Sequence, residues 1–285
     1  MKRIGIFCLT LCMLCGLCAC SITEEKPTKE PLQSYVEQEE IPSRETVRVT
    51  LIEGLTIPEM AVVLEENRVC SAADFIDAVQ TIDYGYDFLK DLPADDYRVY
   101  RLEGYLFPDT YEFYVDSPAS SVVNRLLQNF QKRTEELLPQ IEEKGWTVDE
   151  AVTFASMIQG EADTTDNMAK VSRVLHNRLA PNSGFTKLQL CSTRDYVNFL
   201  LQNGDYDAAT LKQSYNTYYR EGLPVGAINN PGLDALTAAL NPSDDETIKQ
   251  CYYFATDYKT GITYFSKTYA EHEKVIREHG ITDIG

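Results

Sequence analysis

The stretch TVDEAVTFASMIQGEADTTDNMAKVSRVLHNRL, residues 147–179, decides how this chain folds. It predicts two helices that meet at a short polar elbow. The first begins with a capping box at Thr147 and Glu150, in which each side chain satisfies a backbone N–H of the other residue. Apolar side chains then recur at helical spacing and give the helix one buried face. These side chains are Val148, Ala151, Val152, Ala155 and Ile158.

Glu161 ends the first helix and is a candidate general acid. At 3.6 residues per turn it lies roughly 100° from the middle of the apolar face, so its carboxyl is beside apolar side chains. Such a setting raises the pKa of a carboxylic acid and keeps it protonated. Gly160 lets another backbone or a ligand approach closely. Taken alone, however, these residues favour an ordinary exposed glutamate near a helix end.

Composition and charge exclude several classes of protein. The 285 residues can form one large domain or two smaller ones. The formal net charge of -18 repels phosphate backbones, so we expect no nucleic-acid partner and no charge-driven adhesion to anionic lipid. The histidines, His176, His272 and His279, have no metal-site spacing and no Ser-His-Asp order is evident, which disfavours zinc and serine hydrolases. For His272 we favour a structural role.

Residues 1–19 read as a lipoprotein signal peptide. A basic start precedes an apolar run over residues 4–17 that is too short to span a bilayer comfortably. The ending LCAC, whose last residue is Cys20, resembles the bacterial lipobox and predicts a lipid on Cys20; an ordinary secretory signal is the alternative. Residues 20–46 are rich in Glu and Pro and predict a disordered tether. We therefore expect a lipid-anchored protein on the extracytoplasmic face of the bacterial cell membrane.

Three cysteines remain in the body of the chain, namely Cys70, Cys191 and Cys251. Their spacing builds neither a disulfide framework nor a zinc site. We expect small buried side chains that fill space in the core, although one disulfide among them is compatible with an exported protein.

The body of the chain predicts an α+β fold in two parts. Residues 47–95 read as a strand and two helices, a βαα module that looks like a LysM module; a generic βαα unit without affinity for sugar is the alternative. Residues 96–285 read as a mixed, mainly helical domain that ends in a β-hairpin. Its expected elements are a packing helix over 120–141, a helix that starts at Asn230-Pro231, the hairpin over 252–265 and a closing helix over 268–279.

Polar and aromatic side chains in the second part suit a sugar-binding cleft. Residues 97–112 are rich in aromatic rings, which stack on sugars, and include Glu103. Asn216 and Tyr218 precede a Gly-Leu-Pro turn, and Asn229 follows it. Amides and hydroxyls bind N-acetyl and hydroxyl groups well. For each of these residues a role in core packing or in loop hydrogen bonds is the alternative.

Six sequence blocks resemble the endolytic murein transglycosylases, also called MltG or YceG-like proteins. The block FASMIQGEA over 154–162 looks like the active-site helix of that family and places the catalytic acid on Glu161. The block VSRVLHNRL over 171–179 is similar to the family's partner helix. Four more blocks occur in the family's order, so the likeness runs from about residue 47 to the C-terminus. They are LEGYLFPDTY (102–111), LQLCST (188–193), SYNTYYREGLPVGAINNPG (214–232) and YYFATDYKTGITYFSKTYAEHE (252–273).

The resemblance implies an endolytic lytic transglycosylase, a peptidoglycan lyase that uses no cofactor and no metal. Glu161 would protonate the bond between N-acetylmuramic acid and N-acetylglucosamine inside nascent strands and then accept a proton from the muramyl C6 hydroxyl. The cut would leave 1,6-anhydro ends and limit glycan chain length. Glycan strands are the implied partners, with peptidoglycan synthases as further candidates. The implied substrate-binding residues are Gln189, Asn216, Tyr218, Asn229 and Glu103.

Two features depart from the family. Cys191 stands where the family often has an acid, and the predicted anchor is a lipid in place of the family's usual transmembrane helix. Two rival functions stay open. One is a muramidase-type hydrolase in which a second acid, Glu103 or Asp163, activates water. The other is a non-catalytic peptidoglycan-binding lipoprotein.

Overall fold

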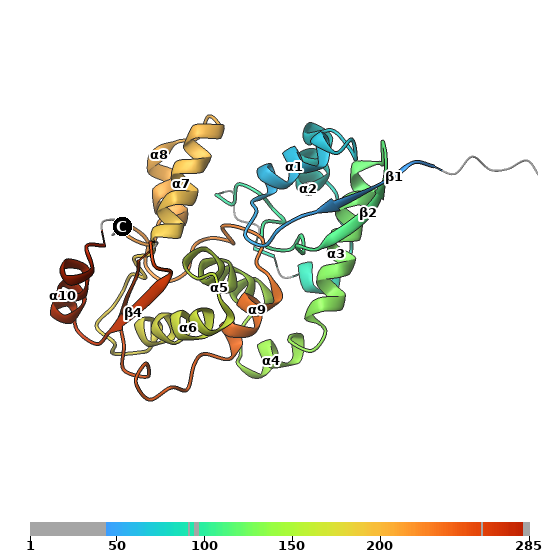
Figure 1. The fold of residues 1–285 in the computed structure, drawn as a ribbon. Helices are drawn as coiled ribbons and strands as arrows, with labels where there is room; N and C mark the ends of the chain where they lie inside the picture. The colour runs from blue at the N-terminus through green and yellow to red at the C-terminus, as the bar shows by residue number, and fades with distance from the viewer. Residues whose placement is uncertain (1–43, 91, 94–96, 258, 282–285) are drawn as a thin grey trace, which may run out of the picture. The chain divides into compact units, whose positions relative to one another are not determined.

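The computed structural model describes residues 44–281, apart from 91, 94–96 and 258 (Figure 1). The predicted signal peptide, the lipobox at Cys20 and the tether up to residue 43 lie outside the described residues. In the described part of the chain, no helix is long and apolar enough to cross a membrane.

The first helix of the predicted pair is α5 (Val148–Glu161). The Thr147 hydroxyl accepts the N–H of Glu150, and the Glu150 carboxylate accepts the N–H of Thr147 at 2.8 Å, which confirms the capping box. All side chains over 151–158 are buried. The helix is therefore enclosed on nearly every side, which exceeds the single apolar face that the spacing predicted.

The second helix is α6 (Thr165–Leu179), and the hydroxyl of Thr164 caps its N-terminus. Helix α9 (Leu233–Leu240) packs against both α5 and α6, as Figure 1 shows. The predicted start of α9 at Asn230 was wrong, because Gly232 occupies the N-cap position. Asn230 is fully buried and its side chain hydrogen-bonds to distant backbone, so it is not available as a cap.

The N-terminal unit contains β1 (Thr46–Thr50), α1 (Ile57–Glu66) and α2 (Ala72–Thr81) in the predicted order. β1 pairs antiparallel with β2 (Thr110–Tyr114), and Thr50 lies opposite Thr110. The strand that completes this small sheet thus comes from beyond residue 95. The LysM-like interpretation of the unit stays a prediction.

The single packing helix expected over 120–141 is two helices, α3 (Ala119–Thr134) and α4 (Leu138–Glu143). Pro139 lies in the first turn of α4. In a continuous helix its ring would clash with the carbonyl of Glu135 and its missing N–H would break the hydrogen-bond ladder, so the helix stops and restarts.

The C-terminal elements follow the prediction closely. β3 (Tyr253–Asp257) and β4 (Ile262–Ser266) form the expected antiparallel hairpin. α10 (Tyr269–His279) ends at Gly280, whose left-handed φ of 62° closes the helix. α10 packs beside both strands of the hairpin, and α6 contacts β3 (Figure 1). The hairpin therefore joins the helix pair to α10.

Two further helices, α7 (Cys191–Asn203) and α8 (Ala208–Tyr215), pack against each other, and α7 also contacts α5. Cys70 and Cys251 carry free thiols. Cys251 is buried, whereas Cys70 and Cys191 are half-buried.

Candidate active site

Glu161 is the last residue of α5, and its carboxyl faces the N-terminus of α7. The backbone N–H of Ser192, in the first turn of α7, donates a 2.9 Å hydrogen bond to Oε1 of Glu161. Burial raises the pKa of Glu161, whereas the Ser192 hydrogen bonds and the charge of Arg178 act in the opposite direction. The net shift is upward, which favours the protonated acid that the sequence predicted.

Gly160 allows this close approach of the two helices. A Cβ atom at position 160 would lie 2.7 Å from Cβ of Ser192, which is closer than real side chains pack. The absence of that Cβ lets the first turn of α7 reach Glu161. Gly160 was expected to admit another backbone or a ligand, and the atoms that approach it here are those of the Ser192 side chain.

Arg178 of α6 fixes a positive charge near Glu161. The residue is 7% exposed, and its guanidinium donates to the carbonyl oxygen of Tyr252 at 2.6 Å and to that of Leu188. Its Cζ also lies 5.6 Å from the ring centre of Tyr253, a cation–π contact. The two carbonyl bonds hold the guanidinium in place. Arg178 was not singled out from the sequence, although it lies in the VSRVLHNRL block.

A cleft of about 480 Å³ opens beside Glu161 and Arg178. Residues from α5, α6, α7, β3, α10 and the segment before α7 line it, together with Tyr218. Of the predicted substrate-binding residues, Gln189 and Tyr218 line this cleft with Glu161. Within the described residues, no group of His, Cys, Asp and Glu side chains is arranged to hold a metal ion.

Gln189 has a left-handed backbone with φ of 53°. That conformation is uncommon for a residue other than glycine and is often found at functional sites. Its N–H donates to the carbonyl oxygen of Thr217 at 3.1 Å, which ties the segment before α7 to the segment that carries Tyr218. The side chain of Gln189 is exposed at the cleft.

Cys191, which stands where an acid was expected, also lines the cleft. Its Sγ lies 3.8 Å from the hydroxyl oxygen of Tyr218. Burial raises the pKa of Tyr218 above its ordinary value, so the phenol keeps its proton. The cleft thus has a thiol and a neutral phenol beside Glu161 in place of a second carboxylate at position 191.

Asn216 and Asn229 are not among the residues that line the cleft. Asn216 is 4% exposed, and its Oδ1 accepts the backbone N–H of Tyr218 at 2.9 Å. Asn229 is 6% exposed, and its Nδ2 donates to the carbonyl oxygen of Ser156 at 2.9 Å, inside α5. Both amides position the elements that carry the site.

Glu103 lies outside the cleft and is 1% exposed. Its carboxyl accepts the N–H of Ile57 at 3.0 Å, Nδ2–H of Asn230 at 2.8 Å and the hydroxyl of Tyr196 at 3.3 Å. Burial raises the pKa of Glu103 to about 8. It joins the N-terminus of α1 to the rest of the fold. Asp163, the other acid considered for a hydrolase, is exposed and is not among the cleft residues.

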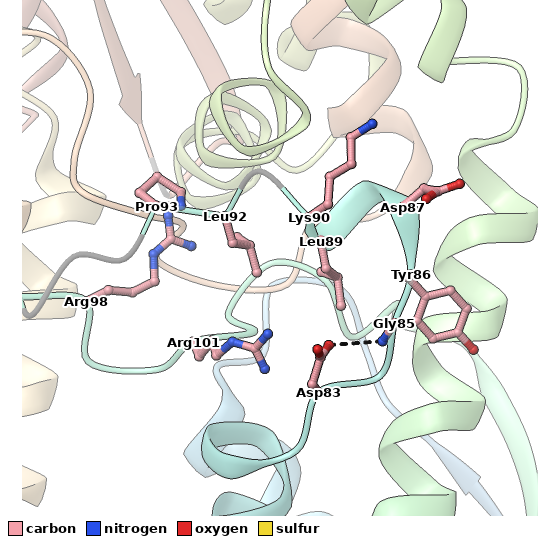
Figure 2. Close-up of a pocket in the computed structure, with 10 residues that line it drawn as sticks. All are labelled: Asp83, Gly85, Tyr86, Asp87, Leu89, Lys90, Leu92, Pro93, Arg98 and Arg101. Carbon is pink, nitrogen blue, oxygen red and sulfur yellow. Dashed lines mark hydrogen bonds between the residues drawn. The ribbon is translucent and has the colours of Figure 1, made fainter.

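A second cavity, of about 550 Å³, lies around the short helix η1 (Asp87–Leu89) (Figure 2). Some of its polar groups bond within the fold: Asp83 accepts the N–H of Gly85 at 3.1 Å, Arg98 pairs with Asp149 at 2.5 Å, and Arg101 donates to the carbonyl oxygen of Ile82 at 2.8 Å. Nε and Nη1 of Arg98 are buried without a hydrogen-bond partner among the described residues. Glu161 lies at the other cleft, and we place the candidate active site there.

Comparison with known proteins supports one family. The sequence matches the YceG-like family over residues 22–278. An endolytic murein transglycosylase of Streptococcus pneumoniae strain D39 is 28% identical over 195 residues, which are 67% of this chain and 35% of the relative. An endolytic murein transglycosylase of Bacillus subtilis strain 168 is 29% identical over 177 residues, 61% of this chain and 46% of the relative. The chain thus spans about a third to a half of the length of these curated relatives.

The fold has a solved counterpart. The crystal structure of a yceG-like protein from Listeria monocytogenes superposes with a TM-score of 0.60 at 21% identity, and the match covers 82% of this chain and all of the other. That likeness shows the fold, a mixed α and β structure that is mostly helical. The chain belongs to the YceG-like family.

Proposed function

We propose that this chain is an endolytic lytic transglycosylase. It cleaves the bond between N-acetylmuramic acid and N-acetylglucosamine inside nascent peptidoglycan strands and leaves 1,6-anhydro ends. The supporting observation is the setting of Glu161. Its carboxyl lies at an open cleft and has a raised pKa. It accepts a hydrogen bond from the N-terminus of α7 and lies near Arg178. The names of the curated relatives agree with this proposal.

A single carboxyl must act first as acid and then as base in this reaction. Burial favours the neutral form of Glu161, which donates its proton to the glycosidic oxygen as the bond breaks. The N–H of Ser192, the N-terminus of α7 and the charge of Arg178 then stabilise the carboxylate. The carboxylate accepts the proton of the muramyl C6 hydroxyl while that oxygen attacks C1 and closes the anhydro ring. Both protonation states are thus supported.

The products separate this proposal from hydrolysis. Purified chain is incubated with uncrosslinked glycan strands, and the fragments are analysed by mass spectrometry. Each new muramyl end should be lighter than a hydrolytic end by one water, about 18 Da. Glu161→Gln should lower the cleavage rate roughly 100-fold or more, because the amide cannot donate the proton. Full-mass reducing ends would instead identify a hydrolase, and unchanged turnover by Glu161→Gln would remove that residue from the chemistry.

A hydrolase remains the second candidate because one other carboxyl, that of Glu273 in α10, lines the same cleft. In a hydrolase the Glu273 carboxylate would activate water, which the product masses test directly. Glu273→Gln should leave a lytic transglycosylase active but abolish a two-carboxylate hydrolase.

We also propose that the chain acts at the outer face of the cell membrane, held by a lipid on Cys20, and that it trims strands as synthases extend them. Wild-type protein should stay with washed membranes, and Cys20→Ala protein should be released. Retention of Cys20→Ala protein would exclude the lipid anchor.

A further inference from the structure

Helix α10 presents one complete face to the cleft that holds Glu161. The five residues of α10 that line the cleft recur at spacings of three and four residues, which places them on a single side of the helix. They are Tyr269, His272, Glu273, Ile276 and Arg277. No side chain of α10 is fully buried, although Tyr269 and His272 on this face also contact Tyr253 of the hairpin. It is accessible to a molecule in the cleft.

Aromatic rings form the first half of this face. The ring of His272 stacks on that of Tyr253 from β3 at 5.4 Å between centres, and the ring of Tyr269 lies 5.8 Å from Tyr253. Tyr269 is 59% exposed, an unusual exposure for a large aromatic ring. Burial and the charge of Arg178 lower the pKa of His272, so the three rings form an uncharged platform. Flat rings with polar edges suit the face of a sugar ring.

Positive charge lies at the other end of the face. Arg277 lines the cleft, and within the described residues it forms no ion pair. Arg178 adds a second positive charge to the same cleft, where burial favours the neutral form of Glu161. Glu273 is the remaining acid of this wall. Two arginines in one cleft of a chain with net charge -18 concentrate positive potential where an anion would bind.

We propose that the inner face of α10, together with Tyr253, is a subsite for an acidic sugar. The exposed ring of Tyr269 contacts the face of a hexopyranose, with His272 and Tyr253 behind it, and Arg277 binds a carboxylate on the sugar's substituent. This inference rests on the proposed function, in which the sugar is N-acetylmuramic acid. The lactyl group of that sugar carries either a free carboxylate or a stem peptide that bears carboxylates. Arg277 would therefore distinguish muramyl strands from neutral N-acetylglucosamine polymers.

Binding to the full-length chain in a Glu161→Gln background tests this subsite without cleavage. Isothermal titration calorimetry uses three ligands: strands with stem peptides, amidase-stripped strands with free lactyl carboxylates, and neutral chitooligosaccharides. Arg277→Ala should weaken binding of a carboxylate-bearing strand about fivefold, as expected for a solvent-accessible ion pair, and leave the neutral oligomer unchanged. A loss of affinity for the amidase-stripped strands identifies the lactyl carboxylate as the group that Arg277 binds. A loss for the strands with stem peptides identifies a carboxylate of the peptide. Tyr269→Ala should weaken all three about fivefold.

Two variants control for indirect effects. Lys274→Ala removes an equal charge from α10 at a residue outside the cleft and should change none of the affinities. Arg277→Lys should preserve the preference for the charged strands. The subsite would be overturned if Arg277→Ala bound all three ligands as tightly as its parent does. It would also be overturned if Arg277→Ala lost as much affinity for the neutral oligomer as for the charged strands. Failure of the wild-type chain to cleave any glycan would refute the proposed function. The calorimetry would still decide whether Arg277 of α10 binds a carboxylate.

Discussion

The backbone N–H of Ser192 donates a 2.9 Å hydrogen bond to Oε1 of Glu161, although the two residues are 31 positions apart. This bond joins the C-terminus of α5 to the first turn of α7. Burial raises the pKa of Glu161, and the N-terminus of α7 supports its anion. The predictions below separate these contributions.

Gly160→Ala should disturb the contact between the two helices. The new Cβ would lie 2.7 Å from that of Ser192, so α7 must move away from Glu161. We expect a loss of roughly tenfold or more in kcat, because small misplacements of catalytic groups are costly, with an unchanged circular dichroism spectrum. Ser192→Gly removes the opposing Cβ but keeps the N–H. The double variant should therefore regain activity relative to Gly160→Ala, and additive losses would contradict the steric explanation.

The pH profile of kcat/KM should report Glu161. Because the reaction starts from the protonated acid, activity should fall as pH rises through the raised pKa of Glu161. The charge of Arg178 lowers that pKa. Arg178→Gln should therefore shift the alkaline limb to higher pH, whereas Arg178→Lys should shift it less. An alkaline limb that stays in place in Arg178→Gln would show that the guanidinium does not act on Glu161.

Glu103 should make folding stability depend on pH. Burial raises the pKa of Glu103 to about 8 from its ordinary value of 4.5. The folded state then holds a proton that the unfolded state releases, so this contribution is full below pH 4.5 and is lost as pH rises through 8. The slope reaches about 1.4 kcal/mol per pH unit.

Urea denaturation at pH 5, 6.5 and 8 measures that slope. The wild-type midpoint should fall as pH rises, and the Glu103→Gln midpoint should fall less. Glu161→Gln is measured beside it, because Glu161 also has a raised pKa and contributes in the same direction. Parallel curves for wild type and Glu103→Gln would mean that Glu103 titrates normally in the fold.

Asn216 should act through Tyr218. Its Oδ1 accepts the N–H of Tyr218, so Asn216→Ala frees the segment that carries this phenol into the cleft. We expect KM to rise about fivefold with a smaller change in kcat, as for the loss of one hydrogen bond. Tyr218→Phe should raise KM similarly, and the double variant should be little worse than either single one. Strictly additive effects on KM would show that Asn216 and Tyr218 act independently.

Local sequence patterns were sufficient for elements stabilised by neighbouring residues. The capping box at Thr147 and the left-handed Gly280 mark helix ends through contacts a few positions away. Pro139 also marks the break between α3 and α4, although the apolar spacing continues across it.

Residues whose role depends on distant partners could not be placed in this way. Glu103 and Asn230 are 127 positions apart, yet their side chains hydrogen-bond in the core. From the sequence, an acid among aromatic residues suits a sugar site as well as a buried hydrogen-bond network. Only the neighbours in space distinguish the two, because burial and partner geometry are tertiary properties.

The sequence by itself determined the helix pair, the position of Glu161 at the end of α5, the hairpin and the closing helix, because helical spacing and capping are local. The tertiary structure decided what surrounds Glu161, since the N–H of Ser192, the charge of Arg178 and the inner face of α10 meet only when distant segments pack together. The tertiary structure also places Glu103 in the core and not in the expected sugar site, because its hydrogen-bond donors come from three separate parts of the chain.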